Sequence, residues 1–222
     1  MTTSGATDFF PANVSLYDEA WERATGGEIM RTGFDLISAQ RACNVMLIDW
    51  QNRGYNLWTL RTSTYTTVSG QATVTLASDV MDVSGVTVAV NGVDRVLQRI
   101  TQPDYAALPS KATSGPPVQM QIQRGTSAPT VTLWPVPNAV YTLTVYELRR
   151  IQNIGAGTQT ADVPYRFLPA LVAGMAYYIA IKRVGLLDRV AMLQQQYEDA
   201  FNAAANEDRE KGSVFIAPMR GR

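Results

Sequence analysis

The sequence contains no histidine and a single cysteine, Cys43, among its 222 residues. Without histidine, the chain cannot build a serine–histidine triad or a histidine-containing zinc site. One cysteine rules out an internal disulfide and a cysteine-rich metal site, and the glycine-rich phosphate loops GxxxxGK[ST] and GxGxxG do not occur. We therefore expect no cofactor and no metal. Assembly in a reducing cytoplasm, with Cys43 as a small buried hydrophobic residue, fits this composition.

An excess of charge and a long hydrophobic run are also missing. Lysine plus arginine and aspartate plus glutamate number 19 each, so the formal net charge is zero, whereas a dedicated nucleic-acid-binding protein carries a basic excess. The longest apolar stretch, residues 167–181, is interrupted by Pro169 and Gly174 and is shorter than the roughly 20 residues of a membrane span. The start, "MTTSGATD", lacks the features of a signal peptide. The sequence predicts a soluble protein without a membrane segment.

Paired carboxylates are the one catalytic option that remains. Glu19 and Glu22 are spaced to lie on adjacent helical turns, and Glu28 follows near Gly26-Gly27. A glycosidase needs only two carboxyl groups, about 5–9.5 Å apart, so a virion-associated peptidoglycan hydrolase is an alternative function. Ordinary carboxylates on a helix surface explain these residues better, and we expect a protein that is not an enzyme.

The chain begins with two helical segments. In "SLYDEAWERATGG", Ser15 is placed as an N-cap, with Asp18 as its capping-box partner, and two glycines end the segment. A longer helix is predicted over about residues 35–53, followed by Gly54 as a C-cap. Its apolar residues recur at steps of three and four, which indicates one buried face; they are Leu36, Ala39, Cys43, Met46, Leu47 and Trp50.

The pattern changes to that of β-strands between residues 57 and 150. Segments such as "QATVTLAS" and "YTLTVYEL" alternate between apolar and polar residues, which is typical of half-buried strands. Asn91-Gly92 lies between two such runs and predicts a type I′ hairpin. About seven strands at this spacing predict a small antiparallel sandwich or barrel-like module.

Helices return near residue 164. One is predicted to run to Gly185, with Pro169 either kinking it or opening its main part. The next has an amphipathic stripe that comprises Leu186, Val190, Leu193, Tyr197, Phe201 and Ala204. We interpret "NIGAGTQTADV" as a flexible connector that precedes these helices. The sequence thus predicts an α+β protein with a discontinuous helical domain (15–55 and 162–211), an inserted β domain (56–161) and an extended tail (212–222).

The tail carries apolar residues outside the last predicted helix: Val214, Phe215, Ile216, Ala217 and Pro218. Burying each of the first three gains about 1.5–3 kcal/mol, and ordering each backbone residue costs about 1–2 kcal/mol. One tail is therefore a marginal binder. It either folds back on its own helices or docks on a partner, and we favour the partner.

Several motifs, taken in order, resemble the head-to-tail adaptor (connector or head-completion) proteins of short-tailed bacteriophages. They are "NVMLIDWQNRGYNLWTL", "SGQATVTLASDVMDV", "TQPDYAALPSKATSGPP", "VTLWPVPNAVYTLTVYELRRI", "DVPYRFLPALVAGMAYYIA" and "YEDAFNAAANEDREKGS". Together they cover most of residues 15–217. No single motif is diagnostic, but unrelated proteins of helix–sheet–helix order would not share the same motifs in the same order. The residues expected to support the β core or its loops are Tyr105, Trp134, Pro135, Pro137 and Tyr141.

The resemblance implies a structural virion protein at the head–tail junction. It implies a ring of twelve copies that binds the portal, meets a tail nozzle or other tail protein, and continues the channel through which DNA passes during ejection without sequence-specific binding. We expect the tail residues 214–218 to dock on the portal or a neighbouring subunit. Arg149 and Arg150, beside Glu147, face the lumen or an interface, or else form a solvated strand end. A tail-tube or nozzle protein is a further alternative, although such proteins typically lack helices at both ends.

Overall fold

The computed structural model describes residues 9, 11–30, 32–54 and 57–208. The chain divides into two compact units. The helical unit combines residues from both ends of the chain, up to Leu57 and from Ile151, and the β module comprises Trp58–Arg150. Helices together with two β-sheets confirm the predicted α+β class. Within the described residues, no helix is both long enough and apolar enough to span a membrane.

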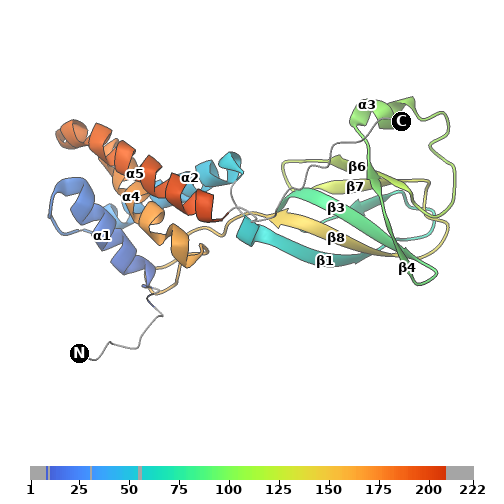
Figure 1. The fold of residues 1–222 in the computed structure, drawn as a ribbon, viewed down its shortest axis with the longest axis horizontal. Coiled ribbons are helices and arrows are strands. Elements are labelled where there is room, and N and C mark those ends of the chain that lie inside the picture. The colour runs from blue at the N-terminus through green and yellow to red at the C-terminus, as the bar shows by residue number, and fades with distance from the viewer. Residues whose placement is uncertain (1–8, 10, 31, 55–56, 209–222) are drawn as a thin grey trace, which may run out of the picture. The chain divides into compact units, whose positions relative to one another are not determined.

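The described residues of the helical unit form four long helices (Figure 1). They are α1 (Asn13–Thr25), α2 (Gly33–Arg53), α4 (Leu168–Ala180) and α5 (Leu187–Glu207), and short 3₁₀ turns, η2 (Tyr165–Phe167) and η3 (Val184–Leu186), precede the last two. Pro169 lies in the first turn of α4 and opens the helix without kinking it. Helix α4 packs against the other three, and most of its residues are buried, as expected of a helix that is apolar on every face.

Close packing and an aromatic cluster hold α2, α4 and α5 together. A Cβ atom added to Gly174 of α4 would press on the sulfur of Met46 and come within 2.8 Å of the Tyr197 ring, so only glycine fits there. The Trp50 ring lies 5.5 Å from Phe167 and 5.4 Å from Phe201, centroid to centroid, and its indole nitrogen donates a 2.8 Å hydrogen bond to the Tyr197 hydroxyl. The predicted apolar faces of α2 and α5 therefore form this core.

Cys43 is fully buried in the same unit, as predicted. Burial raises the pKa of its thiol well above the ordinary range, because the charged thiolate is poorly solvated there. The thiol therefore stays protonated and behaves as a small hydrophobic group.

Helix α1 begins earlier than the sequence predicted, and Ser15 is not its N-cap. The N-cap is Ala12, whose side chain makes no capping hydrogen bond. Instead, the backbone N–H groups of Asn13 and Val14 donate to the carbonyls of Gln159 and Gly157, at 2.8 and 2.9 Å. A distant segment thus satisfies donors that a local side chain usually satisfies.

That segment belongs to "NIGAGTQTADV" (residues 153–163), which was interpreted as a flexible connector. Residues 151–161, which were assigned to the β domain, belong to the helical unit. Polar side chains of α2 bind the backbone of these residues. Gln40 donates to the carbonyl of Ile154 at 3.2 Å, Asn44 accepts from the Ile154 N–H at 2.8 Å, and Gln51 donates to the Ile151 carbonyl at 3.4 Å. The prediction failed because a glycine-containing segment without periodicity can still be ordered by partners far away in the sequence.

The β module contains two four-stranded sheets, with strand orders β1-β8-β3-β4 and β2-β7-β6-β5. The strands are β1 (Leu60–Thr66), β2 (Thr73–Thr75), β3 (Val80–Val90), β4 (Val93–Val96), β5 (Gln98–Arg99), β6 (Gln119–Gln123), β7 (Thr130–Trp134) and β8 (Thr142–Arg149). All pairs are antiparallel except β5 with β6. The described strands thus form a sandwich of open sheets with one parallel pair, and not a closed barrel.

Alternate residues of both sheets point into one core, which includes Val86, Val88, Leu133, Leu143 and Val145. Asn91 and Gly92 both have positive φ, 53° and 76°, and join β3 to β4 with Val90 opposite Val93. This geometry confirms the predicted two-residue hairpin.

The connection between β5 and β6 contains a short helix that periodicity did not predict. Helix α3 (Gln102–Ala107) has Thr101 and Asp104 as a capping box. Aromatic residues also order this region, since the Trp134 indole donates to the Ser110 carbonyl at 2.9 Å and the Tyr141 hydroxyl donates to Asn138 at 2.6 Å. The sequence T-Q-P-D holds the local signal for α3.

Candidate interaction surface

Helix α2 carries a second apolar face on the side opposite its buried one. Four large residues lie on this face at steps of three, eight and three: Phe34, Ile37, Val45 and Ile48, which we name the α2 stripe. Their exposed fractions are 72%, 46%, 56% and 55%. At 100° per residue they fall within one narrow sector, whereas Ala39, Cys43, Met46 and Trp50 fill the opposite side. A row of this kind marks an interaction surface.

Positive charge accompanies the stripe. Arg41 falls within the same sector of α2 and is exposed. Lys182, just after α4, donates to the Ser38 carbonyl at 3.2 Å, and its pKa is lowered by partial burial and then by the charge of Arg41. The two cations are therefore neighbours. A partner surface that covers the stripe would bind more tightly if it placed a carboxylate beside them, because opposite charges attract.

The outward face of α1 has the opposite character. Asp18 and Glu22 are exposed and lie one turn apart. Glu19 forms an ion pair with Arg23 at 2.7 Å, and both side chains are about half exposed. This face presents carboxylates, whereas the α2 stripe presents apolar side chains and two cations.

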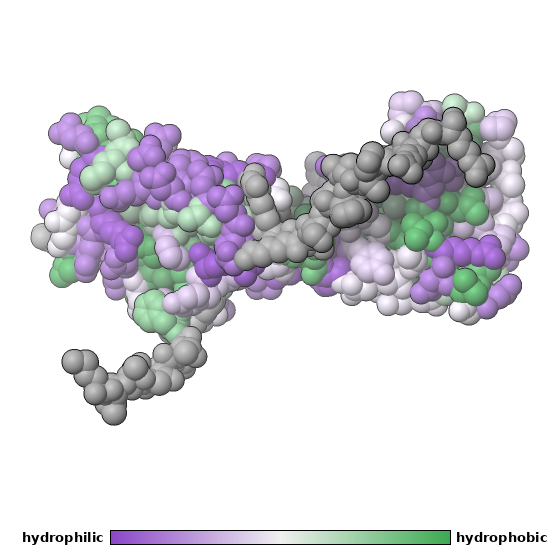
Figure 2. Space-filling model, in the orientation of Figure 1, coloured by the Kyte–Doolittle hydropathy of each residue, from purple (hydrophilic) through white to green (hydrophobic). Residues whose placement is uncertain are grey.

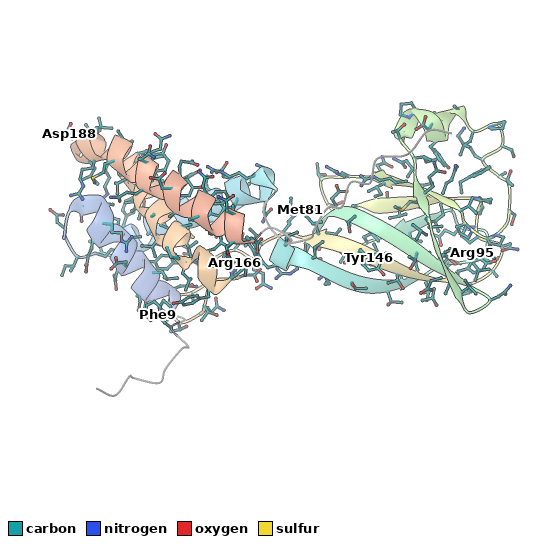
Figure 3. The ribbon with its side chains drawn as sticks, in the orientation of Figure 1. Phe9, Met81, Arg95, Tyr146, Arg166 and Asp188 are labelled. Carbon is teal, nitrogen blue, oxygen red and sulfur yellow. The ribbon has the colours of Figure 1, made fainter. Side chains whose placement is uncertain are left out.

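A hollow of about 500 Å³ lies between α1 and the beginning of α4, and we name it the α1/α4 groove. Phe9, Leu16, Tyr165, Pro169 and Val172 give it an apolar lining. Figure 2 shows hydrophobic residues at the surface of the helical unit, at the end where α1 begins. Figure 3 places Phe9 beside this end and Arg166 at the beginning of α4.

Three of the groove residues are charged: Glu19, Arg23 and Arg166. Of the three carboxylates considered for catalysis, only Glu19 lines the groove, and it forms an ion pair with Arg23. The three carboxylates therefore do not share a site in this groove. Among the described residues, no group of three histidine, cysteine, aspartate or glutamate side chains is arranged to hold a metal ion.

The tail residues predicted to bind a partner, 214–218, lie outside the described residues. The other two predicted site residues end the β module. The Arg149 guanidinium donates to the Arg150 carbonyl at 3.1 Å, and the Arg150 N–H donates to the Asp79 carbonyl at 2.7 Å. These contacts fix the backbone at the end of β8 and leave the Arg150 side chain exposed.

Sequence reasoning missed a buried carboxylate on the same strand. Glu147 has no exposed surface and accepts hydrogen bonds from Arg61 at 3.0 Å, Ser63 at 2.7 Å and Tyr65 at 2.6 Å. Arg61 also binds Asp79 through two nitrogens at 2.9 and 3.0 Å. The signal was present, because Leu143, Val145 and Glu147 alternate inward along β8.

The cluster alters two pKa values. Burial and the hydrogen bond to Glu147 raise the pKa of Tyr65. The hydrogen bond from Arg61 lowers the pKa of Asp79, because it stabilises the carboxylate. The cluster ties β1 to β8 and to the turn before β3, and it satisfies a charge that would otherwise be costly to bury. We interpret it as structural.

The protein is thus an α+β protein with a distinct helical unit and β module, and its helix α2 carries a row of exposed apolar residues. The profile of the SU10 adaptor protein family matches residues 24–222. Because this match covers most of the chain, the protein belongs to that family of phage adaptor proteins. It is a structural virion protein that associates with other head and tail proteins. No match was found among curated proteins.

Proposed function

We propose that the chain is the subunit of an adaptor ring that joins the portal to the tail nozzle and continues the DNA channel. The observation that carries this proposal is the α2 stripe, a row of four exposed apolar side chains on a helix whose other side is fully packed. The occupant we propose for the stripe is a second copy of the chain. Twelve copies, as the resemblance implies, close the ring.

A second copy suits the stripe because the helical unit carries a complementary surface elsewhere. Arg41 and Lys182 lie beside the stripe, and Asp18 and Glu22 lie on α1. Contact between two different patches is heterologous, and repeated around an axis it produces a closed ring when the rotation between copies allows it. Opposite charges at the rim fix the register of such a contact.

The C-terminal residues 214–218 are proposed to anchor the assembled ring to the portal or to a neighbouring subunit. One such segment binds marginally, because the free energy gained by burying its apolar side chains nearly equals the cost of ordering its backbone. Twelve segments presented by one ring bind together, because each docking event raises the local concentration of the next. Avidity then makes the attachment effectively permanent.

Zero net charge supports a passive channel. A strongly basic lining would hold the phosphates of DNA through salt-sensitive contacts, whereas this chain has equal numbers of acidic and basic residues. Arg149 and Arg150 are the proposed lumen or interface residues of the β module. They would contact DNA phosphates without reading sequence.

Substitution of the stripe tests the ring. We expect the chain carrying both Ile37→Glu and Ile48→Glu to fold, since both side chains are about half exposed, but to lose ring assembly when purified portal is added. Native mass spectrometry of the chain alone and with portal gives the copy number. Val96→Glu, at an even more exposed apolar residue of the β module, is the matched control and should assemble normally. Normal rings from the double variant would overturn the role of the stripe.

Charge exchange tests the choice of occupant. We expect Arg41→Glu to weaken assembly by about tenfold, which corresponds to ~1.4 kcal/mol. Adding Asp18→Arg and Glu22→Arg to that variant should restore much of the loss if α1 of one copy meets α2 of the next. If the portal itself covers the stripe, the added substitutions will restore nothing.

A further inference from the structure

The α1/α4 groove has the size and the lining of a binding site. Its volume, about 500 Å³, falls within the range of about 300–1,000 Å³ typical of binding pockets. Its apolar wall includes Leu16, Leu168 and Val172, while Phe9 and Tyr165 stand at it with most of their surface exposed. An open apolar hollow of this size favours an apolar occupant.

The described chain ends beside this groove. Arg166, a lining residue, forms an ion pair with Asp208, and Asp208 is almost completely buried although it follows the last residue of α5. Asp208, the last described residue, therefore lies beside a residue that lines the groove. Figure 3 labels Arg166 near the start of α4.

The sequence that follows has the length and character to fill the groove. Val214 is six residues beyond Asp208, so extended chain reaches about 20 Å. The groove runs along α1 from Ser15 to Arg23, which is about 12 Å at 1.5 Å per residue. Val214, Phe215 and Ile216 are the apolar triplet of the segment, and Pro218 disfavours a helix that continues through it. The other nearby terminus begins "MTTSGATD" and is polar.

We infer that residues 214–218 of the free chain occupy the α1/α4 groove of their own helical unit. Before assembly, the groove covers the apolar tail and the tail covers the groove. Docking of the tail on a ring partner then requires it to leave this groove, so that the groove competes with the partner. The inference concerns the free chain and does not depend on the adaptor ring.

A peptide that competes with the tail tests the occupancy. The probe is a fluorescent peptide with the sequence SVFIAPMRGR, residues 213–222. The receptor is the full chain in which Val214, Phe215 and Ile216 are all changed to serine, so that the groove is vacated. We expect the peptide to bind this variant at least tenfold more tightly than it binds the natural chain, as measured by fluorescence anisotropy.

Two controls locate the binding. Adding Phe9→Ser and Tyr165→Ser, both at mostly exposed residues of the groove, should abolish peptide binding while the circular dichroism spectrum stays unchanged. Met192→Ser, at an exposed residue of α5, should leave peptide binding intact. Equal binding to the natural chain and the serine variant, or no binding to either, would overturn the inference.

Disulfide trapping identifies which copy supplies the tail. In a Cys43→Ala background, cysteines at Ser15 and Ala217 should form a disulfide within a monomer under mild oxidation, and a chain with Gln196→Cys in place of Ser15→Cys should not. Cross-linked dimers without cross-linked monomers would show that the tail occupies a neighbour's groove and would overturn occupancy within one chain. If either assay fails while the chain still forms normal rings on the portal, only the tail inference is overturned and the proposed adaptor function is not.

Discussion

The two units of the molecule satisfy their surfaces in different ways. The β module places its charges in networks, such as Glu147 with Arg61 and Asp82 with Arg99 and Arg124. The helical unit also forms ion pairs, such as Arg53 with Asp49 and Glu198, but it aligns exposed apolar residues in one row on α2 and around the α1/α4 groove. The exposed apolar residues of the β module, such as Val68, Val96 and Val140, lie on separate segments of the chain. The arrangement therefore favours the helical unit as the part that a partner covers.

The largest expected effect comes from the core of the helical unit. Trp50→Ala removes the ring that contacts Phe167 and Phe201 and leaves the Tyr197 hydroxyl without its indole donor. We expect it to lower the free energy of unfolding of this unit by about 3–5 kcal/mol. Hydrogen exchange resolved by residue should show the loss in α2, α4 and α5.

The same measurement sharpens the comparison, since the β module should retain its exchange protection. Trp50→Phe keeps a ring and should cost less. Equal loss of protection in both units would mean that they unfold as one body, and the contrast between them would then have no energetic basis.

The next effect tests the charge network of the β module. Glu147→Leu removes the acceptor of Arg61, Ser63 and Tyr65. We expect a loss of about 2–3 kcal/mol, because hydrogen bonds to a buried charged group are lost, and urea unfolding monitors it. Glu147→Gln, which keeps an acceptor oxygen, should lose less. An unchanged unfolding midpoint for Glu147→Leu would show that the network is dispensable.

The smallest effect is a pH dependence. The folded-state pKa of Asp79 is lowered by its hydrogen bond from Arg61. Its contribution is therefore present above the unfolded pKa of about 3.9 and is lost as the pH falls through the folded value. Since the Asp79 side chain is 45% exposed, solvent screening keeps this contribution below about 1 kcal/mol.

Asp79→Asn should remove that increment and flatten the acid limb of the stability curve in thermal melts recorded between pH 5 and pH 2. Asp94→Asn, at an exposed residue of β4, is the control. An identical acid limb for natural and Asp79→Asn chains would exclude the Arg61 contact as a source of stability.

Local sequence patterns predicted the elements whose buried residues recur at the regular spacing of a helix or a strand. The apolar steps of α2 predicted its buried face, and the alternation of "YTLTVYEL" predicted β8. The beginning of α1 could not be predicted in this way, because its N–H groups are satisfied by carbonyls more than a hundred residues away. Tertiary contacts of this kind leave no local pattern.

The candidate surfaces were harder to predict than the elements. Phe34 and Ile48 belong to α2, whose buried face is itself rich in apolar residues. In the sequence, the exposed α2 stripe is therefore difficult to distinguish from that buried face. The α1/α4 groove combines residues from near both ends of the chain, so that its existence depends on how α1 packs on α4. The resemblance supplied the class of protein, whereas these surfaces came from the packed helices.

The discontinuity of the helical unit affects the order in which the protein is made. Helices α1 and α2 leave the ribosome before the β module, and their packing partner α4 follows it. At about 5–20 residues per second, synthesis of the intervening segment takes on the order of 5–20 s. During that interval the buried faces of α1 and α2, which include Trp21, Met46 and Trp50, lack α4 as a packing partner. The nascent chain must therefore be shielded by a chaperone or wait as a loose hairpin until translation is nearly complete.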